Sequence, residues 1–291
     1  MDGIAKYRLH SNAFERQEED NSIESKRLVF LSVEGVSTEP DYFKSLNKHL
    51  RHRSETIFHV EVLRRKRSDG SSEPLKVLEL MDEYMDVRDN GILPRVRMEQ
   101  LEQKYSKETI SLLLTHPDTI PKSTLRDIGN DLLMEGINLH YRKYLKDISR
   151  ENNDIFAVII DRDGGIGGRS RDVIESCMKE CIEKDYLLFI SNPCFEFWLL
   201  LHLCDVKTEY AHKMIDIKEN KRISKQHSFV SNEVSNRAAH GKSINNRVFA
   251  EKYYPNITQA IERAKDFATA QALLLDHVGT NIHELFQRFG F

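Results

Sequence analysis

Four short, almost wholly apolar runs constrain the fold of this chain more than any other feature. They are RLVFLSV at 27–33, IFHVEVL at 57–63, DIFAVIID at 154–161 and YLLFIS at 186–191. Each run has the length of a strand, and amphipathic helical patterns lie between them. Apolar strands that alternate with helices are typical of a parallel sheet covered on both faces. The sequence therefore predicts an α/β fold with a parallel four-stranded sheet flanked by helices.

Changes in pattern along the chain divide it into three parts. Residues 1–26 are polar without clear periodicity and are expected to form an N-terminal arm. The α/β domain covers 27–205 and includes a charged, helical insertion at about 90–150, where no strand pattern competes. Residues 206–291 form a C-terminal extension that is basic to about 250 and helical after that.

Composition excludes several classes of protein. Apolar residues make up 40% and charged residues 31% of the 291, as in a globular protein, and the net charge is −3. A nucleic acid would therefore have to bind a local basic patch. No run reaches the ~18 apolar residues of a membrane span, and no signal peptide is evident, so we expect a cytoplasmic protein without membrane contact. The 4 cysteines match no disulfide framework; reduced, buried thiols are favoured over a zinc site.

Carboxylates follow two of the predicted strands. Glu34 comes directly after the first run, Asp161 ends the third, and Asp163 lies two residues further on. The carboxyl ends of parallel strands share one edge of the sheet, where ligands bind. Carboxylates gathered there repel one another unless they are protonated or held by a hard divalent cation such as Mg²⁺ or Mn²⁺. We predict such a metal site, the alternative being that these acids are only helix caps or turn residues.

A fourth acid, Glu196, follows the fourth run within the segment SNPCFEFWLLLH. It is interpreted as an extra metal ligand, as a group that supports a ligand, or as an anion favoured by a helix N-terminus. Of two phosphate-binding hypotheses, a phosphate cradle in the glycine-rich turn is weak and a P-loop is rejected. The turn DRDGGIGGR does not match GxGxxG, and the GKS at 241–243 lacks a P-loop glycine because Asn236 stands in its place.

Basic residues near the predicted edge are candidates for contacts with a nucleic-acid backbone. Some follow the second strand, some flank the glycine-rich turn, and some belong to the basic stretch of the extension. The simpler interpretation is that these basic side chains only face solvent. The candidates are Arg64, Arg65, Lys66, Arg162, Arg169, Lys221, Arg222, Lys225 and Lys242.

Three segments together, VEGVSTEPDYF, VIIDRD and SNPCFEFWLLLH, resemble the RloB-like family of bacterial and archaeal defence loci. They are similar more broadly to the Toprim domains of topoisomerases, primases and OLD-family nucleases. The resemblance covers about 27–205 and resumes at 280–286. It implies a four-stranded Toprim sheet in which Glu34 is the acid–base or metal-binding glutamate and Asp161 and Asp163 hold Mg²⁺. Glu39 falls in the motif EGxxTE, where its role is interpreted as structural.

The resulting hypothesis is a Mg²⁺-dependent nuclease that acts on DNA or RNA in antiphage (abortive infection) defence. The resemblance also suggests a partner ATPase of the ABC type, and it leaves homo-oligomer formation open. The alternative is a binding or sensor subunit in which the fold grips nucleic acid or the partner ATPase without chemistry. Nucleotidyl transfer, as in primases, is a third reading, but no pattern here indicates a nucleoside-triphosphate pocket.

Overall fold

A five-stranded sheet forms the centre of the molecule in the computed structural model, which describes residues 27–35, 37–50, 58–63, 74–90, 95–116, 119–134, 154–163, 169–238 and 244–291. The strand order is β2-β1-β3-β4-β5. The first four strands pair in parallel, and β5 is antiparallel to β4. The strands are β1 (Arg27–Val33), β2 (Phe58–Leu63), β3 (Ile155–Asp161), β4 (Leu187–Asn192) and β5 (Gly279–Thr280).

The predicted α/β class is confirmed, and the four apolar runs are strands. The predicted strand count was too low, since the C-terminal extension contributes β5 as a fifth strand at the β4 edge. Sequence patterning could not reveal β5 because a strand of two residues has no periodicity.

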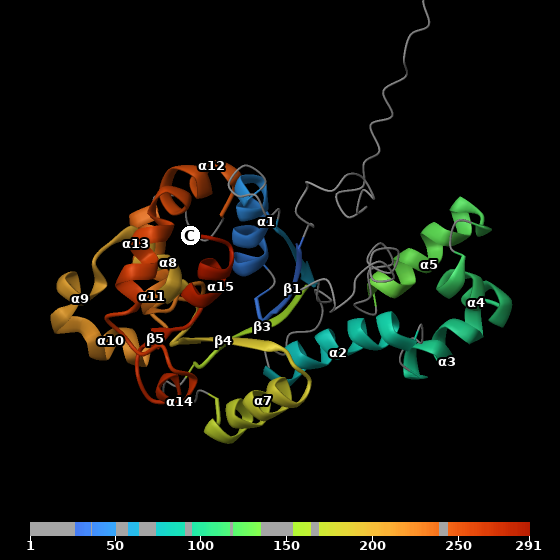
Figure 1. The fold of residues 1–291 in the computed structure, drawn as a ribbon, viewed down its shortest axis with the longest axis horizontal. Coiled ribbons are helices and arrows are strands. Elements are labelled where there is room, and N and C mark those ends of the chain that lie inside the picture. The colour runs from blue at the N-terminus through green and yellow to red at the C-terminus, as the bar shows by residue number, and fades with distance from the viewer. Residues whose placement is uncertain are drawn as a thin grey trace, which may run out of the picture.

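Both faces of the sheet are covered, which explains why the strands are apolar at nearly every position. In β1, Val29 and Leu31 belong to one buried cluster, whereas Leu28 and Phe30 belong to the other. Figure 1 shows the helices on the two sides. One face carries α1 (Thr38–Leu50), α8 (Phe195–Leu203), α11 (Phe229–Ala238), α13 (Ile257–Ala264) and α15 (His283–Arg288). The other carries α2 (Pro74–Asn90), α7 (Arg171–Glu183) and α14 (Gln271–Leu274).

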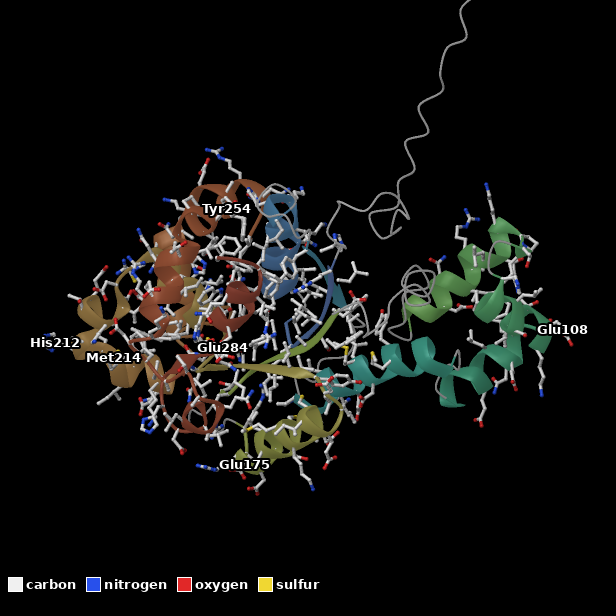
Figure 2. All side chains as sticks on the ribbon, viewed as in Figure 1. Glu108, Glu175, His212, Met214, Tyr254 and Glu284 are labelled. Atoms are coloured by element: carbon white, nitrogen blue, oxygen red, sulfur yellow. The ribbon has the colours of Figure 1, made fainter. Side chains whose placement is uncertain are left out.

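The described part of the predicted insertion is helical. It consists of α3 (Arg95–Lys104), α4 (Lys107–Thr115) and α5 (Lys122–Met134), which lie beyond the far end of α2 in Figure 1. Ser106 caps α4, because its hydroxyl accepts a hydrogen bond from the backbone N–H of Thr109 (3.2 Å). In Figure 2, Glu108 on α4 and His212 mark opposite ends of the molecule.

The C-terminal extension packs into the core of the α/β domain rather than onto its surface. Its buried side chains include Val230, Phe249 and Phe286, which join the cluster of α1 and α8. The shorter elements of the extension are α9 (Val206–Glu209), η3 (Ala211–Lys213), α10 (Met214–Glu219), α12 (Asn246–Val248), η4 (Phe249–Tyr253) and η5 (Tyr254–Asn256). Within the described ranges, no helix is long and apolar enough to cross a membrane.

A closed ring of hydrogen bonds joins α1 to α8 in this core. The indole N–H of Trp198 donates to the hydroxyl of Tyr42 (3.2 Å), which lies 3.1 Å from Nε2 of His202. Nδ1 of His202 lies 2.9 Å from the carbonyl oxygen of Trp198. An indole can only donate and a carbonyl can only accept. Tyr42 therefore donates to Nε2, and His202 is the neutral Nδ1–H tautomer.

Candidate functional site

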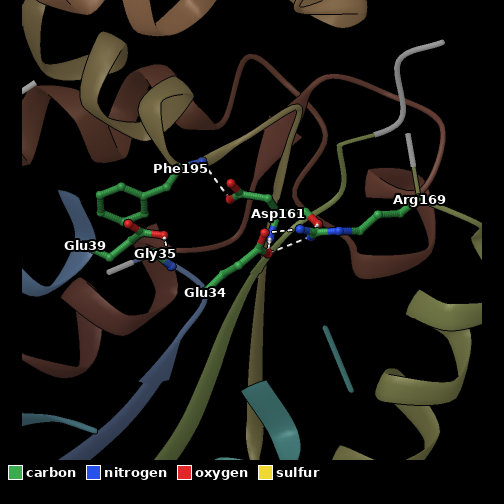
Figure 3. A network of polar contacts seen from close by, with 6 residues as sticks. All are labelled: Glu34, Gly35, Glu39, Asp161, Arg169 and Phe195. Carbon is green, nitrogen blue, oxygen red and sulfur yellow. Dashed lines mark hydrogen bonds and ion pairs between the residues drawn. The ribbon is translucent and has the colours of Figure 1, made fainter. Parts of the chain in front are cut away.

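Glu34 lies where β1 ends, at the carboxyl edge of the sheet, and its carboxylate is held by Arg169 (Figure 3). Nη1 of Arg169 donates to Oε2 of Glu34 (2.6 Å), and Nη2 donates to Oε1. The Asp161 backbone N–H also donates to Oε2 of Glu34 (3.1 Å). The pair is largely buried, with side-chain exposures of 9% for Glu34 and 13% for Arg169. Both oxygens of Glu34 are therefore committed to one guanidinium fork.

Asp161 ends β3, the strand that pairs directly with β1, so its carboxylate lies at the same edge. Its Oδ1 accepts a hydrogen bond from the backbone N–H of Phe195 (2.8 Å), the first residue of α8. A carboxylate is favoured at a helix N-terminus. The alternative considered from the sequence, that these acids only cap helices, therefore accounts for Oδ1 of Asp161 but not for Oδ2. Among the described residues, no hydrogen-bond donor reaches Oδ2.

The electrostatic surroundings of Asp161 are unfavourable for its charge. Burial raises the pKa of Asp161 well above its usual value, and the negative charges of Glu39, Glu196 and Asp163 raise it further. The hydrogen bond from Phe195 opposes this rise only in part. The site thus divides into two halves. In one, Glu34 is paired with Arg169. In the other, burial and neighbouring carboxylates raise the pKa of Asp161, and burial raises the pKa of Asp163 while the charge of Arg162 opposes that rise.

Glu39 belongs to this second half; the resemblance to the motif EGxxTE suggested a structural role for it. It is the second residue of α1, and its Oε1 accepts a hydrogen bond from the backbone N–H of Gly35 (2.9 Å). It is also 5% exposed, and its charge is the first electrostatic cause of the raised pKa of Asp161 after burial. Glu39 therefore combines a structural contact with an influence on the site. The signal in the sequence was the spacing of EGxxTE, which brings a second carboxylate back to the strand tip.

Glu196 lies in the first turn of α8, one residue after the donor to Asp161. Its negative charge raises the pKa of Asp161 and, after burial, of the Cys194 thiol. The structure thus places Glu196 within electrostatic reach of the site. Whether it would hold an ion directly or support a ligand stays a prediction.

Asp163 turns the chain immediately after the strand edge. Its φ of 42° lies in the left-handed region, which aspartate tolerates better than most residues. Its backbone N–H donates to the carbonyl oxygen of Pro193 (2.9 Å), and its carbonyl oxygen accepts from the N–H of Arg169 (3.0 Å). The chain therefore begins to reverse at Asp163; Gly164 and Gly165, which follow it, lie outside the described residues.

The two arginines that flank this turn point inward. Arg162 is 8% exposed, and its guanidinium donates to the carbonyl oxygens of Leu275 (2.8 Å) and Arg169 (2.9 Å). Burial lowers the pKa of Arg169 to about 10. Both side chains are committed to protein groups, so this arrangement does not favour the nucleic-acid contacts predicted for them.

Three predicted basic residues lie on an exposed turn between α10 and α11, residues 220–228, here called the basic turn. Lys221, Arg222 and Lys225 are exposed, and Lys221 pairs with Glu219 (2.7 Å). The turn begins close to the site, because the amide of Asn220 contacts the sulfur of Cys194 (3.4 Å) just before α8. The other candidates, Arg64, Arg65, Lys66 and Lys242, lie outside the described residues.

The oxygen ligands at this edge fit a divalent cation in part. Carboxylate oxygens suit Mg²⁺ or Mn²⁺, and Oδ2 of Asp161, without a donor in the described structure, fits a ligand position. Glu34 can serve as a ligand only when the guanidinium of Arg169 has left its carboxylate. Within the parts of the chain that are described, no three His, Cys, Asp or Glu side chains converge closely enough to hold a metal ion.

Comparison with known protein families agrees with the motifs at this edge. The family model described as RloB-like protein matches residues 29–289. The chain belongs to the RloB-like family. The matched range spans the helical insertion and nearly all of the C-terminal extension. No curated protein and no solved structure matches the chain.

Proposed function

We propose that this RloB-like protein is a metal-dependent nuclease that hydrolyses phosphodiester bonds of DNA or RNA in antiphage (abortive infection) defence. The observation that carries the proposal is the position of the Asp161 carboxylate among other carboxylates, with one of its two oxygens open to a ligand in the described structure. Burial and three neighbouring carboxylates raise its pKa, and its Oδ2 receives no donor among the described residues. A Mg²⁺ or Mn²⁺ ion would relieve this repulsion. The chain belongs to the RloB-like family, and the resemblance of its sequence motifs, which connects that family with defence loci, supports the same proposal.

The strand arrangement supports a sheet of the Toprim type. The order β2-β1-β3-β4 is parallel throughout, and the tips of β1 and β3 carry Glu34 and Asp161 on neighbouring strands. This is the placement that the resemblance implies for the glutamate and the Asp-x-Asp of a Toprim site. The antiparallel β5 is an addition to that pattern.

The proposed roles follow from the contacts of each side chain. A bound Mg²⁺ would supply a Lewis acid and activate a water molecule. Asp161 and Asp163 would hold it, with Glu34 as a further ligand or the general base. The N–H of Phe195 fixes Oδ1 of Asp161 and leaves Oδ2 toward a ligand. Glu39, tied to the N–H of Gly35, keeps the negative potential of the edge high.

The proposal is tested with purified full-length protein, a mixture of DNA and RNA, and Mg²⁺ or Mn²⁺. We expect cleavage that requires the metal and is lost in Asp161→Asn and Glu34→Gln, while thermal melts show that both variants are folded. The matched control is Asp276→Asn, which removes an exposed carboxylate that pairs only at the surface with Arg171 (2.7 Å). Cleavage by Asp161→Asn at the wild-type rate would contradict the assignment.

A second candidate function is a binding or sensor subunit without chemistry. The observation in its favour is the closed pair of Glu34 and Arg169, which takes a proposed catalytic carboxylate out of use. In this case the chain would bind nucleic acid or a partner ATPase of the ABC type, as a monomer or as a homo-oligomer. Nucleic-acid binding that persists in Asp161→Asn, with no metal-dependent cleavage in the wild type, would favour this function.

A further inference from the structure

The guanidinium of Arg169 occupies the place at the strand edge where a cation was expected. It bridges both oxygens of Glu34, and Nη1 also donates to the backbone carbonyl oxygen of Asp161. We infer that Arg169 is a positioning residue that competes with a divalent cation for the carboxylate of Glu34. The inference rests on the proposed metal-dependent function, since it concerns the same carboxylates.

Burial makes this competition strong. With 13% and 9% of their side chains exposed, Arg169 and Glu34 are screened far less than a surface pair. A divalent ion bound by Glu34 and Asp161 would lie beside the positive guanidinium and be repelled by it. The same edge therefore has two arrangements, one with Arg169 on Glu34 and one with the metal on Glu34.

Two hydrogen bonds hold the backbone of Arg169 itself, so a movement of its side chain is enough to release Glu34. The Arg169 N–H donates to the carbonyl oxygen of Asp163 (3.0 Å), and its own carbonyl oxygen accepts from Arg162 (2.9 Å). Arg162 is in turn anchored to the carbonyl oxygen of Leu275 (2.8 Å). The long, unbranched side chain of Arg169 can leave Glu34 by changing rotamers while these contacts remain.

Removing the charge of Arg169 should therefore tighten divalent binding. The experiment titrates Mn²⁺ into full-length protein by isothermal calorimetry, without nucleic acid. We expect Arg169→Gln to bind Mn²⁺ at least about tenfold more tightly than the wild type, because a neighbouring positive charge is gone. The matched control is Arg171→Gln, two residues away, whose guanidinium is 49% exposed and pairs with Glu175 and Asp276. Its affinity should stay within about twofold of the wild type, as expected for a screened surface charge.

The double variant Arg169→Gln/Glu34→Gln is compared with Glu34→Gln alone. If the gain in Mn²⁺ affinity acts through Glu34, the two bind Mn²⁺ equally. Unchanged or weaker Mn²⁺ binding by folded Arg169→Gln, or a gain that persists in the double variant, overturns the inference. If Arg169→Gln does not fold, Arg169→Lys keeps the charge without the fork. It should then bind Mn²⁺ more tightly than the wild type, by less than about tenfold, because it cannot hold both oxygens of Glu34 but still repels the ion. Equal affinity overturns the inference.

The readout separates this inference from the proposed function. Tighter Mn²⁺ binding by Arg169→Gln without any cleavage of nucleic acid would sustain the inference and contradict the nuclease. Cleavage that depends on Asp161, together with unchanged Mn²⁺ affinity in Arg169→Gln, would do the reverse. Absence of Mn²⁺ binding in all variants contradicts both.

Discussion

The carboxylate of Glu39 fills the space in which a Cβ atom on Gly35 would lie. An ideal Cβ at Gly35 would come within 1.9 Å of Oε2 of Glu39, while Oε1 accepts the hydrogen bond of the Gly35 N–H (2.9 Å). The glycine after Glu34 is thus required by a carboxylate four residues later. The motif EGxxTE therefore describes one local contact that sets where the charge of Glu39 lies relative to Asp161.

Gly35→Ala should consequently act on the site more than on stability. The alanine forces the flexible end of Glu39 away from the strand tip, at the loss of one hydrogen bond worth about 1 kcal/mol. We expect a small fall in the urea midpoint and a clear fall in metal-dependent cleavage. The measurements are urea unfolding and the cleavage assay on the same preparation.

Gly279→Ala is the matched comparison. Its Cβ would meet the backbone carbonyl oxygen of Ala268 at 1.9 Å, and backbone cannot move aside cheaply. We expect a loss of more than about 2 kcal/mol in unfolding free energy, since β5 must separate from its neighbours. Equal losses of stability in the two alanine variants would show that Glu39 is held more rigidly than this contact implies.

Asp161→Asn should stabilise the protein at neutral pH. The ionised carboxylate is desolvated and repelled by Glu39 and Glu196, so the neutral amide removes an unfavourable charge. Asn keeps an oxygen that can accept the hydrogen bond of Phe195. We expect a higher melting temperature, by roughly 2–4 °C for each kcal/mol of relieved repulsion. Differential scanning calorimetry at pH 7.5 measures this.

The effect of a divalent ion on the melting temperature gives a second test of Asp161. Addition of Mn²⁺ should raise the melting temperature of the wild type by binding the folded state, and should leave that of Asp161→Asn unchanged. Asp276→Asn serves as the control and should respond to Mn²⁺ as the wild type does. A melting temperature of Asp161→Asn below that of the wild type would show that its charge is compensated in the folded protein.

The strand tips could be predicted from the sequence because their signal is local. An apolar run such as 27–33 shows both that it is a buried strand and where it ends, so Glu34 and Asp161 were placed at one edge correctly. The role of Arg169 could not be predicted. An arginine after a glycine-rich turn has the local pattern of a surface residue, and its return to Glu34 depends on a contact 135 residues apart in the chain.

Glu39 and β5 show two further limits. Glu39 has the pattern of an ordinary acidic residue in the first turn of a helix. The spacing of EGxxTE brings it near the strand tip, and its contact with Gly35 shows how it is held there. The strand β5 gains its place from β4, not from its own two residues. The deciding contact is tertiary for β5 and local, four residues apart, for Glu39, and in both cases the sequence pattern is also compatible with a simpler role.

Acid should destabilise the protein through His202. Burial lowers the pKa of His202 from 6.5 to about 3 in the folded protein. Between these values the unfolded chain binds a proton that the folded protein does not. The contribution of the neutral ring is therefore complete above about pH 6.5 and is lost as the pH falls, with a slope of up to about 1.4 kcal/mol per pH unit.

Urea unfolding at pH 7.5, 6.5 and 5.5 on the wild type and His202→Gln measures this slope. We expect a shallower slope in His202→Gln, though not a flat one, because burial also lowers the pKa of His283. His212→Gln changes an exposed histidine and should keep the wild-type slope. Parallel curves for the wild type and His202→Gln would contradict the assignment of the neutral ring.

The basic turn should contact the phosphate backbone if the proposed function is correct. Replacing Lys221, Arg222 and Lys225 by alanine should weaken nucleic-acid binding and lower the slope of log affinity against log salt by about 0.7–0.9 per lost phosphate contact. Binding is measured by fluorescence anisotropy on single-stranded DNA and RNA in EDTA, so that metal-dependent cleavage does not interfere. The control triple variant replaces exposed lysines outside the turn, Lys179, Lys207 and Lys265, and should keep the wild-type slope. Equal slopes for the two triple variants would show that the nucleic acid does not bind at the basic turn. The contact of Asn220 with Cys194 would then have only a structural role.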